Sequence, residues 1–214
     1  MLTVDQVREA YRRIARRYDR AVALFPVFGV RMARYRRDAV AALGLAPGAM
    51  VVELGCGTGL NFPLLLEAVG PRGRVIGVDL SDAMLAQARA GVERRGWRNV
   101  ELVCADIADY RFPPGVDAIL STFAITLAPT YEEAVRRGAL ALRPGGRLAI
   151  LDLRRPSWPD PLVHFAAWLN RPFGVTLDLE ERHPWESVRR HLHEVRYREY
   201  YFGAIYLCVG ERSR

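Results

Sequence analysis

The stretch "VVELGCGTGLNFP", residues 51–63, decides the fold of this 214-residue chain. An apolar run ends in an acidic side chain, Glu53, and glycines then alternate at Gly55, Gly57 and Gly59. An apolar run, a glycine loop and the following "PLLLEAVG" predict a strand, a tight turn and a helix. In an open α/β sheet such a loop follows the carboxyl end of its strand, which is where ligands bind.

The rest of the chain continues this alternation of strands and helices. Strands are expected at 49–54, 73–80, 99–107, 116–125 and 147–153, and helices at 61–70, 81–96 and 130–143. Residues 144–146, "PGG", predict a turn, 185–195 a further helix, and 197–212 a last strand or hairpin. Regular alternation predicts an α/β fold with a parallel sheet covered by helices on both faces.

The length favours a single domain with one hydrophobic core. Within it, residues 1–47 are expected to form an N-terminal helical cap and residues 48–153 the α/β core. Residues 154–190, rich in Pro and Trp, predict an inserted lid over a substrate site. Residues 191–214 are expected to complete the sheet.

The glycine spacing excludes two classes of ligand site. A phosphate-binding P-loop needs a Lys followed by Ser or Thr, and the chain contains no Lys. A dinucleotide loop needs a glycine at the sixth position, but Leu60 or Phe62 stands there in the two possible registers. A GxGxG loop that follows a carboxylate remains.

A carboxylate beside the loop favours a cationic ligand over a pyrophosphate. S-adenosylmethionine carries an ammonium and a sulfonium and no phosphate, and glycines let the backbone approach its methionine portion. Glu53 would attract the ammonium. Asp79 ends the second expected strand, where a carboxylate accepts the ribose hydroxyls, and Asp106 ends the third, within reach of the adenine amino group.

Four segments resemble the successive motifs of class I S-adenosylmethionine-dependent methyltransferases: "VVELGCGTG", "VIGVDLSDAML", "VCADI" and "LRPGGRLAILDL". The resemblance covers roughly residues 48–153. It implies a Rossmann-like, seven-stranded, mostly parallel sheet with one antiparallel strand, and S-adenosylmethionine as the cofactor. The implied cofactor residues are Glu53, Gly55, Cys56, Gly57 and Gly59 at the methionine end, Asp79 at the ribose, Leu80, Met84, Asp106 and Ile107 around the adenine, and Ser121 and Thr122 beside the sulfonium.

The N-terminal "YRRIARRYD" is similar to the segment that precedes the core in ubiquinone and menaquinone biosynthesis methyltransferases. The resemblance implies that this segment folds over the cofactor and that Tyr18 closes the site, whereas a plain packing role for Tyr18 is the alternative. Those enzymes carry an Arg-Asn pair after their fourth strand, where this chain has Thr126 and Leu127. This departure argues against a quinone as the substrate.

The expected substrate pocket is apolar and aromatic, which suits a small lipophilic or ring-bearing acceptor such as a quinone precursor, a secondary metabolite or a phospholipid. Its expected lining is Phe25, Phe28, Phe123, Thr126, Phe165, Trp168 and Phe173. A general base is needed only if the acceptor must lose a proton. His164 and His183 are the candidates, although a single His is more often structural.

Charge is concentrated at the N-terminus, where the first 40 residues hold ten arginines and four carboxylates. A solvated helix face would account for this arginine-rich N-terminal arm. The alternative with a functional consequence is peripheral contact of the arm with an anionic membrane. Cys56, Cys104 and Cys208 show no zinc spacing, so no metal site is expected. No secretory signal or spanning segment is apparent, which favours a cytoplasmic protein.

Two other functions compete with a small-molecule methyltransferase. The arginine arm would supply phosphate contacts if the substrate were RNA, and a protein substrate is the related alternative. No appended RNA-binding module or acceptor segment of the "NPPY" type follows the fourth strand, so nucleic acid is disfavoured. A cofactor-binding protein without turnover is the third candidate, which the intact set of cofactor residues argues against.

Overall fold

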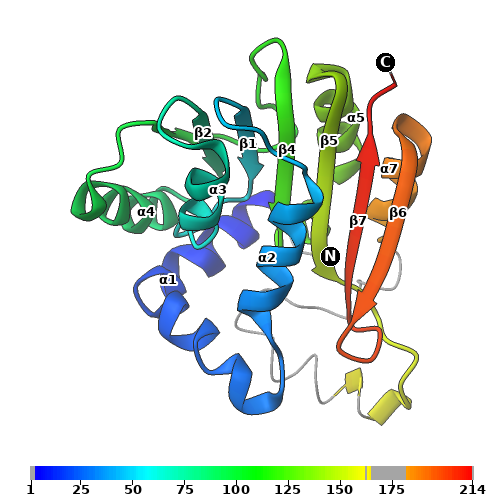
Figure 1. The fold of residues 1–214 in the computed structure, drawn as a ribbon. Coiled ribbons are helices and arrows are strands. Elements are labelled where there is room, and N and C mark those ends of the chain that lie inside the picture. The colour runs from blue at the N-terminus through cyan, green and yellow to red at the C-terminus, as the bar shows by residue number, and fades with distance from the viewer. Residues whose placement is uncertain (1–2, 162, 165–181, 214) are drawn as a thin grey trace.

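The computed structural model describes residues 3–161, 163–164 and 182–213. In this part of the chain, seven strands form one sheet in the order β3-β2-β1-β4-β5-β7-β6 (Figure 1). The strands are β1 (Met50–Leu54), β2 (Arg74–Asp79), β3 (Val100–Cys104), β4 (Val116–Thr122), β5 (Leu142–Leu153), β6 (His193–Tyr200) and β7 (Ile205–Glu211). Pairings among β1 to β5 are parallel, and β7 is antiparallel to both β5 and β6. The predicted mostly parallel sheet with one antiparallel strand is confirmed.

Helices cover both faces of the sheet. On one face, α2 (Met32–Ala42), α3 (Phe62–Val69) and α4 (Asp82–Arg95) pack against a core that includes Val51 and Val75. On the other, α5 (Tyr131–Ala141) and α7 (Pro184–His191) pack against a core that includes Val52. Successive residues of a strand point to opposite faces, so the continuous apolar run of β1 supplies both cores.

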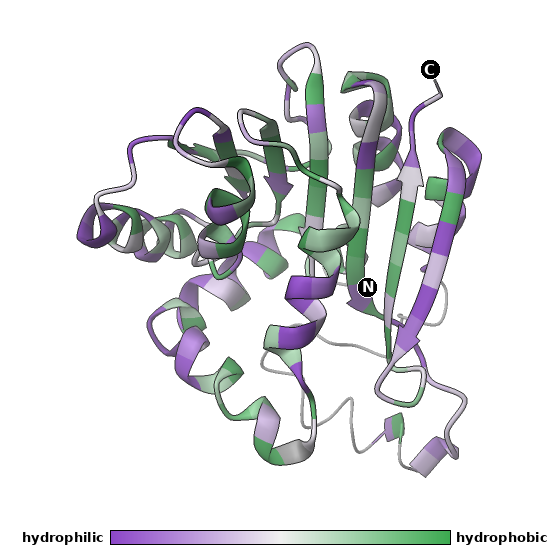
Figure 2. Ribbon diagram, in the orientation of Figure 1, coloured by the Kyte–Doolittle hydropathy of each residue, from purple (hydrophilic) through white to green (hydrophobic). Residues whose placement is uncertain are grey.

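Hydropathy follows this layering (Figure 2). The central strands are largely hydrophobic, and β6, at the edge of the sheet, is mostly hydrophilic. An edge strand has one unpaired side, and charged side chains there protect it from pairing with another chain. In the described residues, no helix is long and apolar enough to cross a membrane.

Two short helical elements and one long helix lie beyond the carboxyl ends of the parallel strands (Figure 1). Helix α1 (Val4–Val22) begins with a capping box between Thr3 and Gln6 and packs against α4. The 3-10 turn η1 (Phe25–Phe28) joins α1 to α2, and η2 (Ile125–Leu127) follows β4. The carboxyl edge of the sheet is therefore enclosed by the N-terminal segment.

One local prediction is wrong and another is met in part. The helix expected to run to Val195 ends at His191, because Leu192 is extended and His193 already pairs with Glu211 of β7. The turn expected at residues 144–146 is an irregularity within β5: the register with β4 shifts there and Gly145 has φ = +75°, while Gly145 and Gly146 exchange hydrogen bonds with Arg212. In both places pairing with the C-terminal strand overrides the local preference. The division into a cap, a core, an insertion and a C-terminal part stays a prediction.

Candidate functional site

A cavity lies at the carboxyl ends of β1, β2, β3 and β4, between the sheet and α1. It brings together most of the side chains and loops predicted to bind a cofactor. Those that line it are Tyr18, Gly55, Cys56, Gly57, Asp79, Leu80, Met84, Asp106, Ile107 and Thr122. Residues from five separate segments thus meet as the motif order predicts.

The glycine loop is fixed by hydrogen bonds to the neighbouring strand. The amides of Gly55 and Cys56 both donate to the carbonyl of Val78, at 2.8 and 3.0 Å. Gly57 has φ = +55°, and a Cβ there would lie 3.2 Å from Met84 Cε, across the cavity wall. Glycine adopts this left-handed backbone readily and keeps the wall open to a ligand.

The other two loop glycines are required for packing as well. A Cβ on Gly55 would lie 2.2 Å from Ala124 Cβ, in the loop after β4. A Cβ on Gly59 would lie 2.5 Å from the Phe62 ring, and Gly59 does not line the cavity. The prediction that Gly59 lines the methionine end is therefore not supported by its position, because its space is taken by the start of α3.

Asp79 connects the glycine loop to the helix after β2. One carboxylate oxygen accepts the amide of Gly57 at 2.8 Å, and the other accepts the amide of Ser81 at 2.8 Å. Burial raises the pKa of Asp79, and these two amides oppose the shift. A carboxylate oxygen has more than one acceptor position, so both oxygens can still accept hydroxyl groups from the cavity.

Glu53 lies beneath the loop rather than in the cavity, with 1% of its surface exposed. One carboxylate oxygen accepts from the Asn61 amide, and the other has no hydrogen-bond partner. Burial raises the pKa of Glu53 to about 7, while Asn61 and Arg36 lower it. An unpartnered buried carboxylate oxygen is costly, so Glu53 is poised to gain from a cation or a proton nearby.

Arg36 of α2 is the residue of this site that sequence reasoning missed. It is 7% exposed, lines the cavity, and donates to Thr122 at 2.7 Å and to Asn61 at 3.1 Å. Its guanidinium lies 5.3 Å from the centre of the Phe123 ring. The sequence placed it in a run of arginines, and nothing in that run distinguishes the one that turns inward.

Helix α1 contributes a wall of the cavity through Tyr11, Tyr18 and Arg8. The two tyrosine rings lie 6.1 Å apart, and burial raises the pKa of both phenols. Asp19 of α1 accepts a 2.6 Å hydrogen bond from the hydroxyl of Thr58 in the glycine loop. The expected folding of this segment over the loop is therefore seen in the geometry, whereas the closing role of Tyr18 stays a prediction.

The loop after β4 is held by Asp152 at the end of β5. Asp152 accepts the amides of Ala124 at 3.2 Å and Thr126 at 3.0 Å, and burial raises its pKa to about 6. Phe123 lines the cavity with φ = +54°, a backbone conformation unfavourable for a bulky side chain. Asp152 thus holds Phe123 in the cavity wall.

Several predicted site residues lie away from the cavity. Ser121 and Thr126 are fully buried, and Phe25 packs against the core. His164 contacts the carbonyl of Asp160, and His183 precedes α7, beside Trp185 and Glu186. Their positions do not support a role as general base. The Phe28 side chain and the residues Phe165, Trp168 and Phe173 lie outside the described part of the chain.

The family comparison agrees with this geometry. Residues 51–146 match the family described as "Methyltransferase domain". The predicted resemblance to class I S-adenosylmethionine-dependent methyltransferases is confirmed for these residues.

Relatives extend the similarity beyond the domain. The demethylmenaquinone methyltransferase of Listeria welshimeri is 28% identical over 156 residues, which is 72% of this chain and 65% of the relative. The arsenite methyltransferase of Halobacterium salinarum is 36% identical over 118 residues, 54% of this chain and 30% of the relative. This chain therefore spans less than two thirds of the length of these methyltransferases.

A solved structure shares the fold over nearly the whole length. The putative methyltransferase solved in complex with the Haloferax volcanii Trm112 methyltransferase activator matches with a TM-score of 0.73 at 20% identity. The match covers 97% of this chain and 98% of that one. At this identity the likeness concerns the fold alone.

Proposed function

We propose that this chain is an S-adenosylmethionine-dependent methyltransferase that acts on a small, lipophilic or ring-bearing acceptor. The observation that carries the proposal is that one cavity is lined by both the glycine loop with Asp79 and the aromatic side chains Tyr11, Tyr18 and Phe123. The loop and Asp79 suit a ribose and an amino acid portion, and the rings suit an apolar acceptor.

The chain's own groups match the charges of the cofactor. Asp79 would accept the ribose hydroxyls while it holds Gly57 in place. Glu53 would act on the ammonium through its electric field rather than by contact, because its carboxylate is buried beneath the loop. Arg36, which lines the same cavity, would bind the carboxylate of the methionine portion, since a guanidinium with unused N–H groups pairs well with a carboxylate.

Bound S-adenosylmethionine supplies an electrophilic methyl group on its sulfonium. The contribution of the protein is alignment of the acceptor with that methyl group and exclusion of water. Helix α1, through Tyr11 and Tyr18, covers the loop, and Phe123 forms the opposing wall. In the described residues, no His lies in this wall, so an acceptor that is already nucleophilic at neutral pH fits the site best.

The acceptor class rests on the cavity wall after β4, which is formed by Phe123, Ala124, Leu127, Ala128 and Pro129. This apolar wall favours a hydrophobic or aromatic molecule over a charged metabolite. The Listeria relative is named for demethylmenaquinone, so quinone precursors belong in any acceptor panel.

The test is release of S-adenosylhomocysteine from the purified chain with a panel of acceptors: quinone precursors, other ring-bearing compounds and phospholipids. Turnover that rises at least tenfold with a lipophilic acceptor supports the proposal. Tight cofactor binding without stimulation by any acceptor would indicate a cofactor-binding protein instead. Stimulation only by RNA or a protein would contradict the proposed acceptor class.

A further inference from the structure

Three large apolar side chains are exposed at the carboxyl end of the sheet. Leu24 directly precedes η1 and Val27 lies within it, and these side chains are 60% and 78% exposed. Phe202, in the turn between β6 and β7, is 84% exposed. We call these three residues the apolar tip. Isolated apolar residues are common on surfaces, but this group comes from two elements at one end of the molecule.

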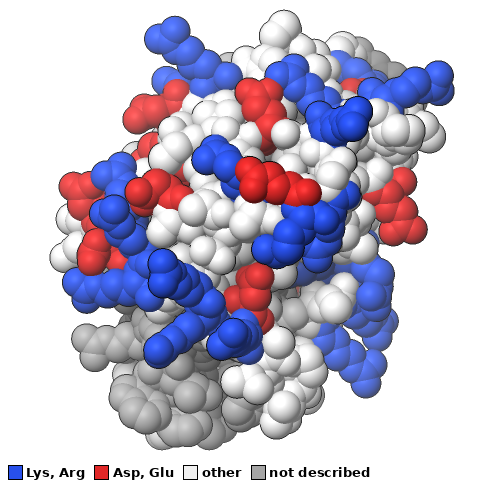
Figure 3. All heavy atoms as spheres, turned by 90° about the vertical axis from the view of Figure 1, so that its left-hand side faces the viewer, with Lys and Arg blue, Asp and Glu red and all other residues white. Residues whose placement is uncertain are grey.

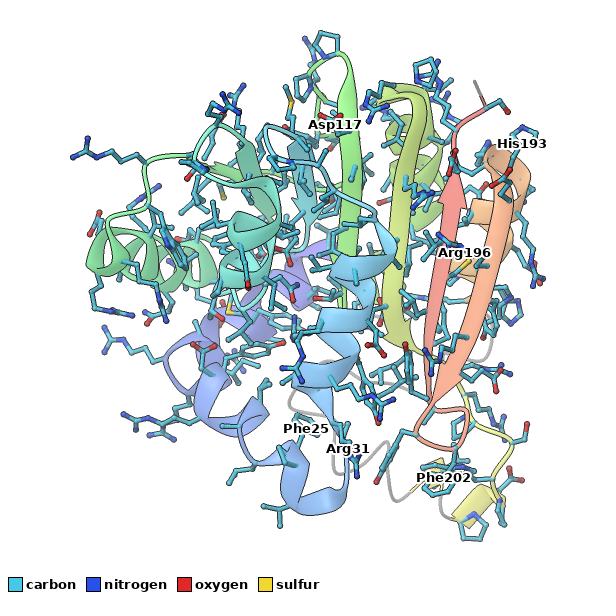
Figure 4. The ribbon with its side chains drawn as sticks, viewed as in Figure 1. Phe25, Arg31, Asp117, His193, Arg196 and Phe202 are labelled. Carbon is cyan, nitrogen blue, oxygen red and sulfur yellow. The ribbon has the colours of Figure 1, made fainter. Side chains whose placement is uncertain are left out.

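The two elements of the apolar tip contact each other. A Cβ on Gly29, at the end of η1, would lie 3.9 Å from the ring of Tyr201, which precedes Phe202. Trp158 Nε1 donates to the carbonyl of Phe202 at 3.1 Å and fixes the turn from the other side. Figure 4 shows Phe25, Arg31 and Phe202 together at this end of the molecule. The η1 segment and the β6–β7 turn therefore contact each other at the end of the molecule that carries the apolar tip.

The backbone of the β6–β7 turn is strained where it presents Phe202. Tyr201 and Phe202 have φ of +47° and +53°, left-handed values that cost bulky residues free energy. The Phe202 ring lies 5.8 Å from the neighbouring Tyr201 ring and is otherwise almost fully exposed. Tight hairpin turns require positive φ at their central residues, so the turn itself sets this backbone and presents an aromatic ring to solvent.

Arginines without an ion pair among the described residues precede and follow the η1 part of the apolar tip along the chain. Five exposed arginines of late α1 and early α2 form no ion pair with a carboxylate within the described residues: Arg16, Arg17, Arg20, Arg31 and Arg34. The carboxylate of Asp19, the nearest in sequence, is bonded to Thr58. Figure 3 shows Lys and Arg side chains, here all arginine, gathered low on the α1 face, next to uncharged surface.

We propose that the apolar tip docks on an anionic lipid surface. Phe202, Val27 and Leu24 enter the interfacial region, and the five arginines contact the headgroups. An apolar tip flanked by unpaired cations matches such a surface in both hydropathy and charge. A nucleic acid would use the arginines but not the apolar side chains, and a second copy of the chain would bring the same positive charge against itself.

Docking in this orientation turns the carboxyl edge of the sheet, where the cavity lies, toward the lipid. An apolar acceptor dissolved in the bilayer would then have a short path to the site. The docking itself does not depend on the identity of the acceptor or on turnover, so failure of either proposal can be told from failure of the other.

The test is co-sedimentation of the full chain with vesicles of phosphatidylglycerol and phosphatidylcholine, compared with phosphatidylcholine alone. We expect binding only to the anionic vesicles, and weakening by salt. Phe202→Asn keeps a residue that tolerates positive φ, and with Val27→Thr should weaken binding on the order of tenfold. Arg17→Gln with Arg20→Gln should weaken it about 25-fold, at roughly fivefold per arginine.

Matched control variants distinguish binding through the apolar tip from non-specific adsorption of the protein to vesicles. Leu140→Gln removes an apolar side chain that is 62% exposed on α5. Arg94→Gln with Arg98→Gln removes two exposed arginines at the far end of α4. These variants should bind vesicles as the unsubstituted chain does, and far-UV circular dichroism should show that all variants are folded.

Three outcomes would overturn the proposal. The first is no binding to anionic vesicles, and the second is an equal loss of binding in the control variants. The third is a change of oligomeric state in Phe202→Asn, measured by light scattering, because the apolar tip would then be an interface between copies. Tight RNA binding through Arg17 and Arg20, without vesicle binding, would assign the arginines to nucleic acid.

Discussion

Asp79 holds the glycine loop and faces the cavity with the same carboxylate, so its two roles have to be separated by experiment. Asp79→Asn keeps the shape and one carbonyl oxygen but loses the charge. Hydrogen bonds to a charged group contribute about 1.5–3 kcal/mol, so binding of S-adenosylhomocysteine should weaken roughly 10- to 100-fold. Thermal shift against ligand concentration measures this.

The control for Asp79 is Asp109→Asn, an exposed carboxylate outside the cavity lining. It should leave ligand binding unchanged. If Asp79→Asn binds the ligand as tightly as the unsubstituted chain and melts at a lower temperature, Asp79 serves only to hold the loop.

Glu53 should give the protein a pH-dependent stability. Burial raises its pKa from 4.5 to about 7, so between these values the native chain holds a proton that the unfolded chain has released. The free energy of unfolding should therefore fall as pH rises from about 4.5 to 7, and Glu53 should add no further change above that window.

Glu53→Gln removes this titration while keeping an oxygen for Asn61. The melting temperature of the variant, relative to the unsubstituted chain, should rise with pH across the same window. Asp79 and Asp152 also have raised pKa values, so only the difference between the two proteins isolates Glu53. A difference that does not vary with pH would mean that Glu53 is not buried as described.

At the scale of single residues, the sequence predicts those residues whose type and position together indicate a chemical role. Gly57, Asp79 and Asp106 can be predicted because each lies at or just after the end of a strand, and all three line the cavity. Arg36 could not be found, because it is one of ten arginines in the first 40 residues and only the packing of α2 turns it inward. The prediction that Gly59 lines the cavity is not supported, because the sequence cannot distinguish a glycine required for packing from one required for ligand binding.

At the scale of elements, α1 is tied to the glycine loop by the hydrogen bond from Thr58 to Asp19. Asp19→Ala removes this bond, which is worth about 1 kcal/mol, so the KM for S-adenosylmethionine should rise roughly fivefold. The kcat should change little, because the side chains of the cavity stay in place.

Glu9→Ala, in the first half of α1, is the matched control, since it removes a carboxylate whose partner is Arg13 on the same helix and neither residue lines the cavity. Steady-state kinetics of both variants measure the difference. Equal effects of the two substitutions would show that α1 acts through its own stability and not through the bond to the loop.

The order of strands and helices could be predicted from hydrophobic periodicity, because the apolar residues of each central element are the ones that it buries in the core. The boundaries failed where pairing distant in sequence decides. His193 and Glu194 carry the polar side chains of a solvated helix, yet β6 begins there because β7 offers backbone partners. Pairing with Arg212 likewise draws Pro144–Gly146 into β5. Propensity is a weak prior wherever such pairing is available.

For the whole molecule, one end carries the features that bear on function. The cavity, helix α1 and the apolar tip all lie at the carboxyl edge of the sheet, which is where open α/β sheets bind their ligands. The assignment of cofactor binding is supported by the family match and by the geometry of the site. The assignment of the acceptor class depends on the apolar wall alone. The cofactor claim is therefore the one to test first.

The most direct measurement is calorimetric titration of the full chain with S-adenosylmethionine and then with S-adenosylhomocysteine, at low and at high salt. We expect one site per chain, micromolar binding of both ligands, and weak dependence on salt, since Asp79, Glu53 and Arg36 are largely shielded from solvent. Absence of binding by either ligand would mean that Gly55, Gly57 and Asp79 form this loop for another purpose, and the proposed function would be wrong.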